Sequence, residues 1–317
     1  MLKKSCCILA MVASLFLAAF TAQAAGAYPS KPIHIVVPWA AGGGTDIVAR
    51  ALADAIRSAI NVPVIIDNIT GAAGSTGNKS VADATPDGYT LLFNGDSDIV
   101  GAVTMMQSGY NLDSFTYIAG VYYSPTWILS NAKRGLTNFN DFLEKAKANP
   151  GKLILASTTP TGAQMVMATA IHRATGAPFR IIPYQGGSDM NKALLGDQVE
   201  AGIIHAPMML EEIKSGAIKV IGTGGSLANC TYAPLRDMKT LEEMGIPVSM
   251  GIHRGLMAPK ATPPDVVAQL AAIVKKATES KEFIAFGERF GFLPQWLDGP
   301  AYEKNIKSML KQFQQAQ

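Results

Sequence analysis

Cysteine is scarce in this 317-residue sequence, which contains three. Cys6 and Cys7 lie in an N-terminal segment that we expect to be removed on export, so Cys230 is the only cysteine expected in the mature chain. A lone cysteine excludes an intramolecular disulfide and argues against a cysteine-based zinc site. The four histidines form neither a His-Glu-x-x-His motif nor a close pair, so we predict no metal site.

An excess of charge of either sign is also missing. The chain carries 27 basic and 24 acidic side chains, a formal net charge of +3, which falls to +1 without Lys3 and Lys4 of the N-terminal segment. This balance gives no reason to expect nucleic acid or an anionic membrane surface as a partner. A hydrophobic fraction of 48% is enough to bury a core, which excludes a disordered or fibrous chain.

Long apolar runs are absent after the N-terminus. Residues 1–24 combine a basic start, an apolar run from Cys6 to Phe20, and small residues at the end. This pattern is typical of a secretory signal peptide cleaved near Ala24, so we expect a periplasmic protein. Both cysteines of the segment lie at the start of its apolar run, whereas a lipid anchor would need a cysteine just after it, so we expect no lipid anchor. No later segment reaches about 18 consecutive apolar residues, so we predict no membrane span.

What the sequence does contain is an alternation of short β-branched runs with helical patterns, which is typical of an α/β fold. In the predicted helix 47–60, Val48, Leu52 and Ile56 share one apolar face, as in a helix that packs on a sheet. Thr262 is expected to cap a late helix that has proline at its first positions. The predicted strands are 33–37, 62–66, 89–93, 127–130, 153–156, 179–183, 199–204 and 218–222, and the other predicted helices are 139–148, 163–174, one ending at Leu195, and 266–277.

The alternation changes near residues 127 and 251, and no low-complexity tract separates the parts. We therefore expect two α/β lobes that are joined by short crossing segments instead of a flexible tether. Lobe 1 is predicted to comprise residues 25–126 and 252–317, and lobe 2 residues 127–251.

A weak internal repeat places similar loops in the two predicted lobes. Residues 36–46 (VVPWAAGGGTD) are answered by residues 181–189 (IIPYQGGSD). The glycines let the backbone approach a ligand, and Thr45 or Ser188 is expected to cap the following helix. Neither loop contains Lys or Arg, so an anion would bind to backbone N–H groups at a helix N-terminus.

Two such loops are stronger evidence for a ligand site than one loop. A single glycine-rich turn is equally well explained as ordinary turn chemistry. Ligands of open α/β sheets lie at the carboxyl ends of the strands, so two facing lobes would hold a ligand between two helix N-termini. A molecule with two anionic ends, or with one anionic and one polar end, would suit this geometry. The loops 68–77, 94–98 and 157–162 also follow predicted strands and are rich in small hydroxyl side chains.

These motifs, taken in order, resemble the Bug/TctC family, the extracytoplasmic substrate-binding proteins of tripartite tricarboxylate transporters. The resemblance covers nearly the whole mature chain. It is carried by YPSKPI (28–33), PWAAGGGTDIVARALA (38–53), GAAGSTG (71–77), PDGYTLL (86–92), ANPGKL (148–153), YQGGSDMNKALLGDQVEAGI (184–203), and Ala258-Pro259 with Pro263.

The resemblance implies a type II periplasmic-binding-protein fold, in which two α/β lobes close on a substrate carboxylate, in part through ordered water. It implies no catalytic residue and no cofactor, a monomer, and delivery of the ligand to membrane transporter subunits. Trp39 and Tyr184 would wall the cleft or pack against the core. The implied ligand-binding residues are Trp39, Ala41, Gly42, Gly43, Gly44, Thr45, Asp46, Gly74, Ser75, Ser97, Thr159, Thr161, Tyr184, Gly186, Gly187, Ser188 and His205.

The chain departs from the family pattern at positions that concern the identity of the ligand. Gln185 stands where Lys or Arg is usual, 158–161 lacks a common glycine-rich run, and His205 follows its strand where an acidic-amide pair is usual. His205 could contact a polar group or make binding pH-sensitive, although a structural role is the favoured interpretation for a lone histidine. Arg180, Arg236 and Arg254 could each reach the cleft, but solvated surface charge is the favoured interpretation for all three.

Other function classes have weaker support. A sensor component would use the same fold. A nucleotide-binding α/β enzyme is suggested by Gly42, Gly44 and Asp67, which partly imitate a dinucleotide fingerprint, but Ile47 stands at the third glycine. A hydrolase is disfavoured because the sequence contains no G-x-S-x-G elbow.

Overall fold

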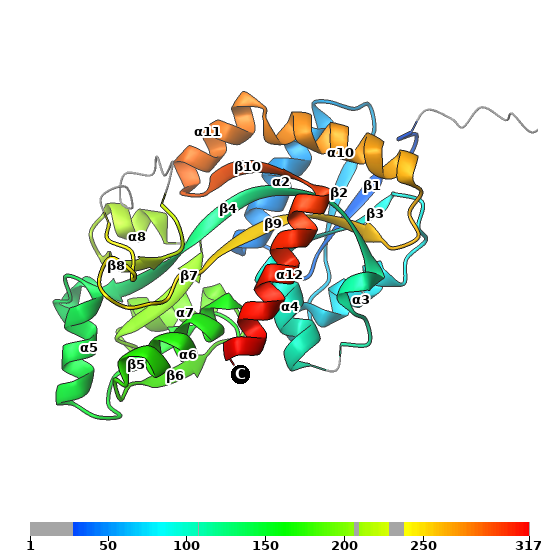
Figure 1. Cartoon of the computed structure of the whole chain (residues 1–317). Helices are drawn as coiled ribbons and strands as arrows, with labels where there is room; N and C mark the ends of the chain where they lie inside the picture. The colour runs from blue at the N-terminus through cyan, green and yellow to red at the C-terminus, as the bar shows by residue number, and fades with distance from the viewer. Residues whose placement is uncertain (1–27, 107, 206–208, 228–237, 317) are drawn as a thin grey trace, which may run out of the picture.

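The computed structural model describes residues 28–106, 108–205, 209–227 and 238–316 (Figure 1). The predicted signal peptide, Cys230 and Arg236 lie outside these residues. Every helix within the described ranges is too short or too polar to span a bilayer.

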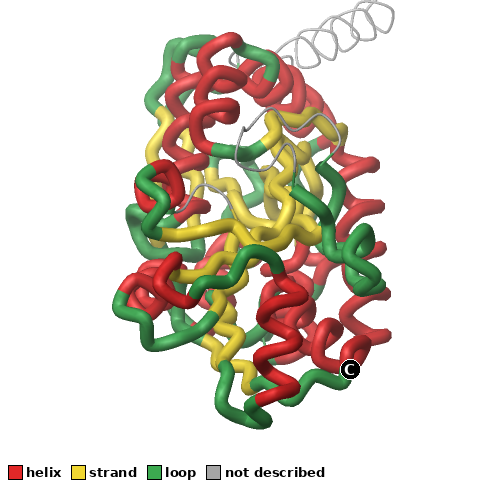
Figure 2. Tube along the Cα trace, turned by 90° about the vertical axis from the view of Figure 1, so that its left-hand side faces the viewer, coloured by secondary structure: helices red, strands yellow, loops and turns green. Residues whose placement is uncertain are grey.

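Ten strands form one sheet among the described residues, and helices lie on both sides of it (Figure 2). The strands are β1 (Ile33–Val37), β2 (Val64–Asn68), β3 (Thr90–Gly95), β4 (Phe115–Asn131), β5 (Ile154–Ser157), β6 (Arg180–Pro183), β7 (Ala201–His205), β8 (Ile218–Gly224), β9 (Gly251–Pro259) and β10 (Leu293–Asp298). Their order is β2-β1-β3-β9-β4-β7-β5-β6, and both β8 and β10 pair with β4 outside this path. The mixed α/β class agrees with the prediction.

Each predicted helix is present with ends within a few residues of the prediction, but the pattern does not predict the helices Ser75–Ala82, Asp96–Met105, Lys281–Phe290 and Gly299–Ala316. The α-helices are α2 (Gly44–Arg57), α3 (Ser75–Ala82), α4 (Asp96–Met105), α5 (Phe139–Ala148), α6 (Ala163–Thr175), α7 (Gly187–Leu195), α8 (Leu210–Lys214), α10 (Pro264–Thr278), α11 (Lys281–Phe290) and α12 (Gly299–Ala316), and three 3-10 turns are η1 (Ala72–Gly74), η2 (Leu112–Ser114) and η3 (Ala132–Arg134). The prediction that Thr262 caps α10 is wrong. Pro263 is the N-cap, while the Thr262 hydroxyl donates to the Pro259 carbonyl at 2.8 Å.

Two parallel arrays account for most of the sheet. β1 pairs in parallel with β2 and β3, and β5 pairs in parallel with β6 and β7. In the first array, α2 buries Val48, Leu52 and Ile56 and packs against α10 and α11. Helices α2, α3 and α4 follow the carboxyl ends of the strands of the first array, and α6 and α7 follow those of β5 and β6 in the second. Parallel arrays of this kind form binding crevices at that edge.

Strand β4 runs from one array to the other. It pairs antiparallel with β9 from Phe115 to Pro125, and with β7 and β8 from Thr126 to Asn131. β9 in turn pairs with β3, so the two long strands lie side by side across the middle of the molecule (Figure 1). The predicted strand 127–130 covers only the end of β4 and is too short. Ser124 and Thr126 interrupt the apolar pattern, yet both are buried and the Thr126 hydroxyl donates to the Met250 carbonyl at 2.5 Å.

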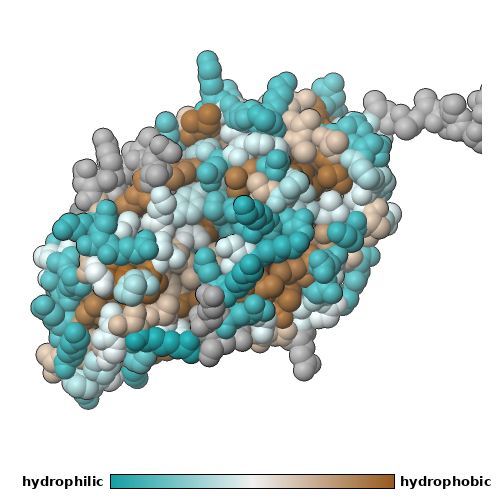
Figure 3. All heavy atoms as spheres, viewed as in Figure 1, coloured by the Kyte–Doolittle hydropathy of each residue, from teal (hydrophilic) through white to brown (hydrophobic). Residues whose placement is uncertain are grey.

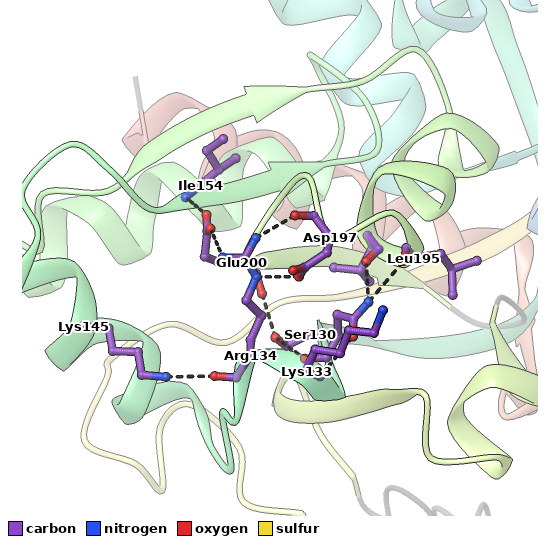
Figure 4. Close-up of polar contacts among 10 residues, drawn as sticks. Ser130, Lys133, Arg134, Lys145, Ile154, Leu195, Asp197 and Glu200 are labelled. Carbon is purple, nitrogen blue, oxygen red and sulfur yellow. Dashed lines mark hydrogen bonds and ion pairs between the residues drawn. The ribbon is translucent and has the colours of Figure 1, made fainter.

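A polar network holds the far end of β4 to its neighbours (Figure 4). The Arg134 guanidinium contacts the carboxylates of Asp197 at 2.5 Å and Glu200 at 2.7 Å. Glu200 also accepts from the Ile154 backbone N–H at 2.7 Å, and its carbonyl accepts from the Ser130 hydroxyl at 2.7 Å. One guanidinium therefore ties η3 to the α7–β7 turn and, through Glu200, to the start of β5.

The outer surface is mixed in character. On the face seen in Figure 3, hydrophilic residues surround separate apolar patches, and no continuous apolar belt crosses the molecule. Helix α12 lies on this face and packs against α4, α6 and β4, so it contacts elements that follow both parallel arrays (Figure 1).

Candidate ligand-binding site

A cavity of about 370 Å³ lies where the carboxyl ends of the two parallel arrays meet. Its walls come from the β1–α2, β5–α6 and β6–α7 loops, α4, the end of β7, and β9. This volume is that of a site for a small organic molecule. The lining residues are Trp39, Ala40, Ala41, Gly42, Gly43, Gly44, Thr45, Asp98, Thr158, Thr159, Gln164, Gln185, Gly186, Gly187, Ser188, Asp189, His205 and Arg254.

The two repeated loops face this cavity with helix N-termini that no side chain caps. Gly43 is the N-cap of α2 and Gly186 is the N-cap of α7, and neither helix has a side-chain cap hydrogen bond. The prediction that Thr45 or Ser188 caps these helices is wrong, because both residues lie inside the first turn. The first-turn N–H groups of a helix lack intrahelical partners and favour an anion.

An N-terminus that begins after glycine without a side-chain cap also occurs at three neighbouring helices, whereas two helices farther from the cavity have side-chain caps. Helices α3, α4 and α6 also begin after glycine, at Gly74, Gly95 and Gly162, without a side-chain cap. In contrast, the Asn138 side chain caps α5 and the Ser280 hydroxyl caps α11. Glycine N-caps are thus concentrated at the helices that follow the two parallel arrays.

Asp46 holds the first loop in shape. Its carboxylate accepts from the Gly42 backbone N–H, from Arg50 and from the Asn68 amide, each at 2.9 Å. Burial alone would raise the pKa of Asp46, but these donors outweigh it and the pKa lies below its usual value. Gly42 has a φ of 77°, which favours glycine at this turn. Asp46 does not line the cavity; it supports the loop that does.

Trp39 forms one wall. Its indole N–H donates to the Asn94 side-chain oxygen at 3.2 Å, and its carbonyl accepts from the Asn68 amide at 2.9 Å. Gly74 leaves room for the indole, because a Cβ there would lie 3.3 Å from the ring. Gly74 therefore acts through Trp39 and does not line the cavity.

Four more of the predicted residues lie outside the lining. Ser75 and Ser97 are buried in the first turns of α3 and α4, and the Thr161 carbonyl packs against Gly101 of α4. Tyr184 packs against the core, the second of the two roles considered for it. The remaining predicted residues all border the cavity, namely Trp39, Ala41, Gly42, Gly43, Gly44, Thr45, Thr159, Gly186, Gly187, Ser188 and His205.

The inner wall contains a buried ion pair that the sequence interpretation missed. Arg254 is 6% exposed, and its guanidinium donates to the Asp98 carboxylate at 3.1 Å and to the Tyr122 hydroxyl at 2.8 Å. The interpretation of Arg254 as surface charge is wrong. Position 254 lies in β9, opposite Tyr122 of β4, and this long-range register buries the side chain. The local pattern gives no signal for this burial, because residues on both faces of β9 are buried from Arg254 onward.

Three titratable groups line this wall, namely Arg254, Asp98 and His205, and burial affects the pKa of each. Burial lowers the pKa of Arg254, but Tyr122 and Asp98 outweigh it and hold the pKa above its usual value. Burial raises the pKa of Asp98, and the guanidinium opposes that effect. The pKa of His205 lies well below its ordinary value, first because of burial and second because of Arg254, while the Pro125 carbonyl opposes both. His205 is therefore a neutral imidazole at neutral pH.

The geometry gives no support to a metal site or a dinucleotide site in the described chain. Within the described residues, no group of three or more His, Cys, Asp or Glu side chains could hold a metal ion. Asp67, the acidic residue of the partial dinucleotide pattern, instead contacts the His34 ring at 2.7 Å and does not line the cavity.

Comparison with known proteins places the chain among transport receptors. A family model described as the tripartite tricarboxylate transporter family receptor matches residues 48–315. Protein BugT of Bordetella pertussis is 32% identical over 265 residues, which cover 82% of this chain and 80% of that protein. The structure of the periplasmic binding protein BugD is 29% identical with a TM-score of 0.81, covering 91% of this chain and 98% of that one. MatC of Rhodopseudomonas palustris, solved with bound malate, shares the fold at 22% identity and a TM-score of 0.80, over 91% and 99% of the two chains.

Proposed function

The chain belongs to the tripartite tricarboxylate transporter family of receptors, which are solute-binding proteins and not enzymes. On this premise we propose that it captures a small organic carboxylate in the cavity described above. The observation that carries the proposal is the pair of uncapped helix N-termini at Gly43 and Gly186 that border one cavity. Both present backbone N–H groups where a carboxylate would lie.

Ligand capture proceeds by closure of two lobes. Residues 25–126 and 252–317 form one lobe and residues 127–251 the other, with β4 and β9 as the crossing strands. A carboxylate bound to α2 and α7 together is held only when both lobes approach it. The ligand therefore favours the closed form by its difference in affinity between the two states.

The captured ligand is delivered to membrane subunits of a transporter. The protein acts as an exported monomer, released into the periplasm after removal of residues 1–24. The first ligands to examine are dicarboxylates, since MatC, which shares the fold, was solved with bound malate.

The experiment is thermal unfolding of the chain from Ala25 onward against a panel of mono-, di- and tricarboxylates, amino acids and nucleotides. A ligand at 100 times its Kd adds about 2.7 kcal/mol of stability, which raises the Tm visibly. Stabilisation by a subset of carboxylates supports the proposal. Stabilisation by nucleotides alone, or by none of the carboxylates, overturns it.

A further inference from the structure

The inner wall of the cavity carries polar atoms without hydrogen-bond partners in the described chain. Gln164 is 4% exposed and its side-chain oxygen is unpaired, and Arg254 is 6% exposed with an unpaired Nε. His205 is 5% exposed, and in the described chain its ring has the Pro125 carbonyl as a neighbour and no partner for its second nitrogen. All three residues line the cavity. Buried polar atoms are paired in most folded proteins, so these atoms indicate a polar ligand group at this end.

These atoms offer both kinds of hydrogen bond. Arg254 Nε is a donor and Gln164 Oε1 is an acceptor. The N–H of the neutral His205 ring faces the Pro125 carbonyl, so the ring supplies an acceptor at its other nitrogen. The inner wall of the cavity therefore differs from the helix N-termini, whose backbone groups are N–H donors only.

The fixed charges at this wall cancel each other. Arg254 and Asp98 are both buried and lie 3.1 Å apart, so the guanidinium already has a carboxylate partner. A second carboxylate of a ligand would be repelled by the Asp98 carboxylate, and an ammonium group would be repelled by the Arg254 guanidinium. Asp96 adds negative charge nearby, but it does not line the cavity, and its carboxylate accepts from the His253 and Ser97 backbone N–H groups. Burying an unpaired charge is strongly unfavourable.

We propose that the ligand carries one carboxylate and, at its far end, an uncharged group that both donates and accepts hydrogen bonds, such as a primary amide. The carboxylate lies at the helix N-termini, and the uncharged group lies against Arg254, His205 and Gln164. Asp98 sets this selectivity because it neutralises Arg254. This inference rests on the proposed function and narrows its substrate class.

The test uses compounds of matched length whose far group is a carboxylate, a primary amide or an ammonium. Succinate, succinamate and 4-aminobutanoate form one series, and glutarate, glutaramate and 5-aminopentanoate form the other. Calorimetric titration of the wild-type chain should give the tightest binding for the amide of at least one series, by at least about tenfold over its charged partners. Tighter binding of the dicarboxylate or the amino compound in both series overturns the inference.

Two variants test the roles of the ion pair. Asp98→Asn leaves Arg254 uncompensated and should shift the preference toward the dicarboxylate by at least about tenfold, whereas Arg254→Gln should shift it toward the amino compound. Asp54→Asn is the matched control, because it breaks the exposed Asp54–Arg57 pair and should leave the preference unchanged. An unchanged preference in folded Asp98→Asn contradicts the role of Asp98. The wild-type series decides the substrate class even if a variant fails to fold.

The two proposals fail in different ways. Binding of a dicarboxylate in preference to its amide refutes only the uncharged far group and leaves carboxylate capture intact. Absence of binding by every carboxylate in the thermal panel refutes both.

Discussion

Asp46 shows how one side chain prepares a site that it does not enter. It contacts the turn at Gly42, the next helical turn at Arg50 and the end of β2 at Asn68. Three donors on one buried carboxylate hold the loop before any ligand arrives, which lowers the entropy lost on binding. The N–H groups of the first loop are thus positioned by an ionised acid placed behind them.

Gly43 offers the sharpest test of the first loop at the level of one residue. Its φ of −76° and ψ of 163° are open to any residue, so Gly43→Val should fold. The added side chain lies at the cavity wall, with its Cβ 3.2 Å from the Ala40 carbonyl. We expect carboxylate affinity to fall at least about 100-fold, or by about 2.7 kcal/mol. Isothermal titration measures the loss, and a Tm within a few degrees of wild type serves as the control. Wild-type affinity would refute the role of this helix N-terminus.

His205 predicts a pH dependence of stability. Its folded pKa lies well below the ordinary value of 6.5, so the unfolded chain takes up a proton in a range where the folded chain does not. Stability contributed by the neutral ring is present above about pH 6.5 and is lost as pH falls below it, by up to about 1.4 kcal/mol per pH unit.

The measurement compares the urea unfolding free energy of wild type and His205→Gln between pH 7.5 and 5. The wild-type protein should lose more stability on acidification, because the variant has no ring to protonate. Every other histidine is common to both proteins, so the difference reports on His205. Parallel curves for the two proteins would show that the folded and unfolded pKa values are the same.

At the level of elements, β4 derives its position from contacts along its whole length. It pairs with β9 and β10 over one part and with β7 and β8 over the other. The network around Arg134 holds its far end to β5 and to the α7–β7 turn (Figure 4). The end of β4 is thereby kept rigid, so movement between the halves is expected in the crossing strands nearer the cavity.

Arg134→Ala should therefore destabilise the protein without changing the site. It leaves Glu200, whose side chain is 16% exposed, without its cation, and we expect a loss of about 1–2 kcal/mol in the free energy of unfolding. Lys79→Ala removes the exposed Lys79–Asp83 pair and should cost less than about 0.5 kcal/mol. Chemical denaturation gives both values. Equal losses, or a changed ligand affinity in folded Arg134→Ala, would contradict this account.

At the level of the whole molecule, the cavity walls come from elements that follow both parallel arrays, and the proposed closure predicts that the two sides approach each other when a ligand binds. Small-angle X-ray scattering should show a smaller radius of gyration with saturating carboxylate than without it. The Gly43→Val variant under the same conditions is the control and should show no change. Identical scattering from the free and the saturated wild-type protein would refute closure.

Much of the architecture could be predicted from local pattern. The alternation of β-branched runs and amphipathic segments predicts most of the described strands but only about half of the described α-helices, because side-chain periodicity is a local property. The repeated glycine-rich loops predict most of the cavity wall, since a strand followed by a helix places its loop at one edge of the sheet. Family membership was likewise evident from the order of short motifs, and the family match confirms it.

The tertiary structure alone decided the inner wall. Arg254 looks like surface charge in the sequence, and it is buried because β9 pairs with β4 at Tyr122, 132 residues away along the chain. The length of β4 was hidden for the same reason, since its buried Ser124 and Thr126 are explained by neighbours distant in sequence. Register between distant strands determines which polar groups meet in the interior, and periodicity within one segment does not contain that information.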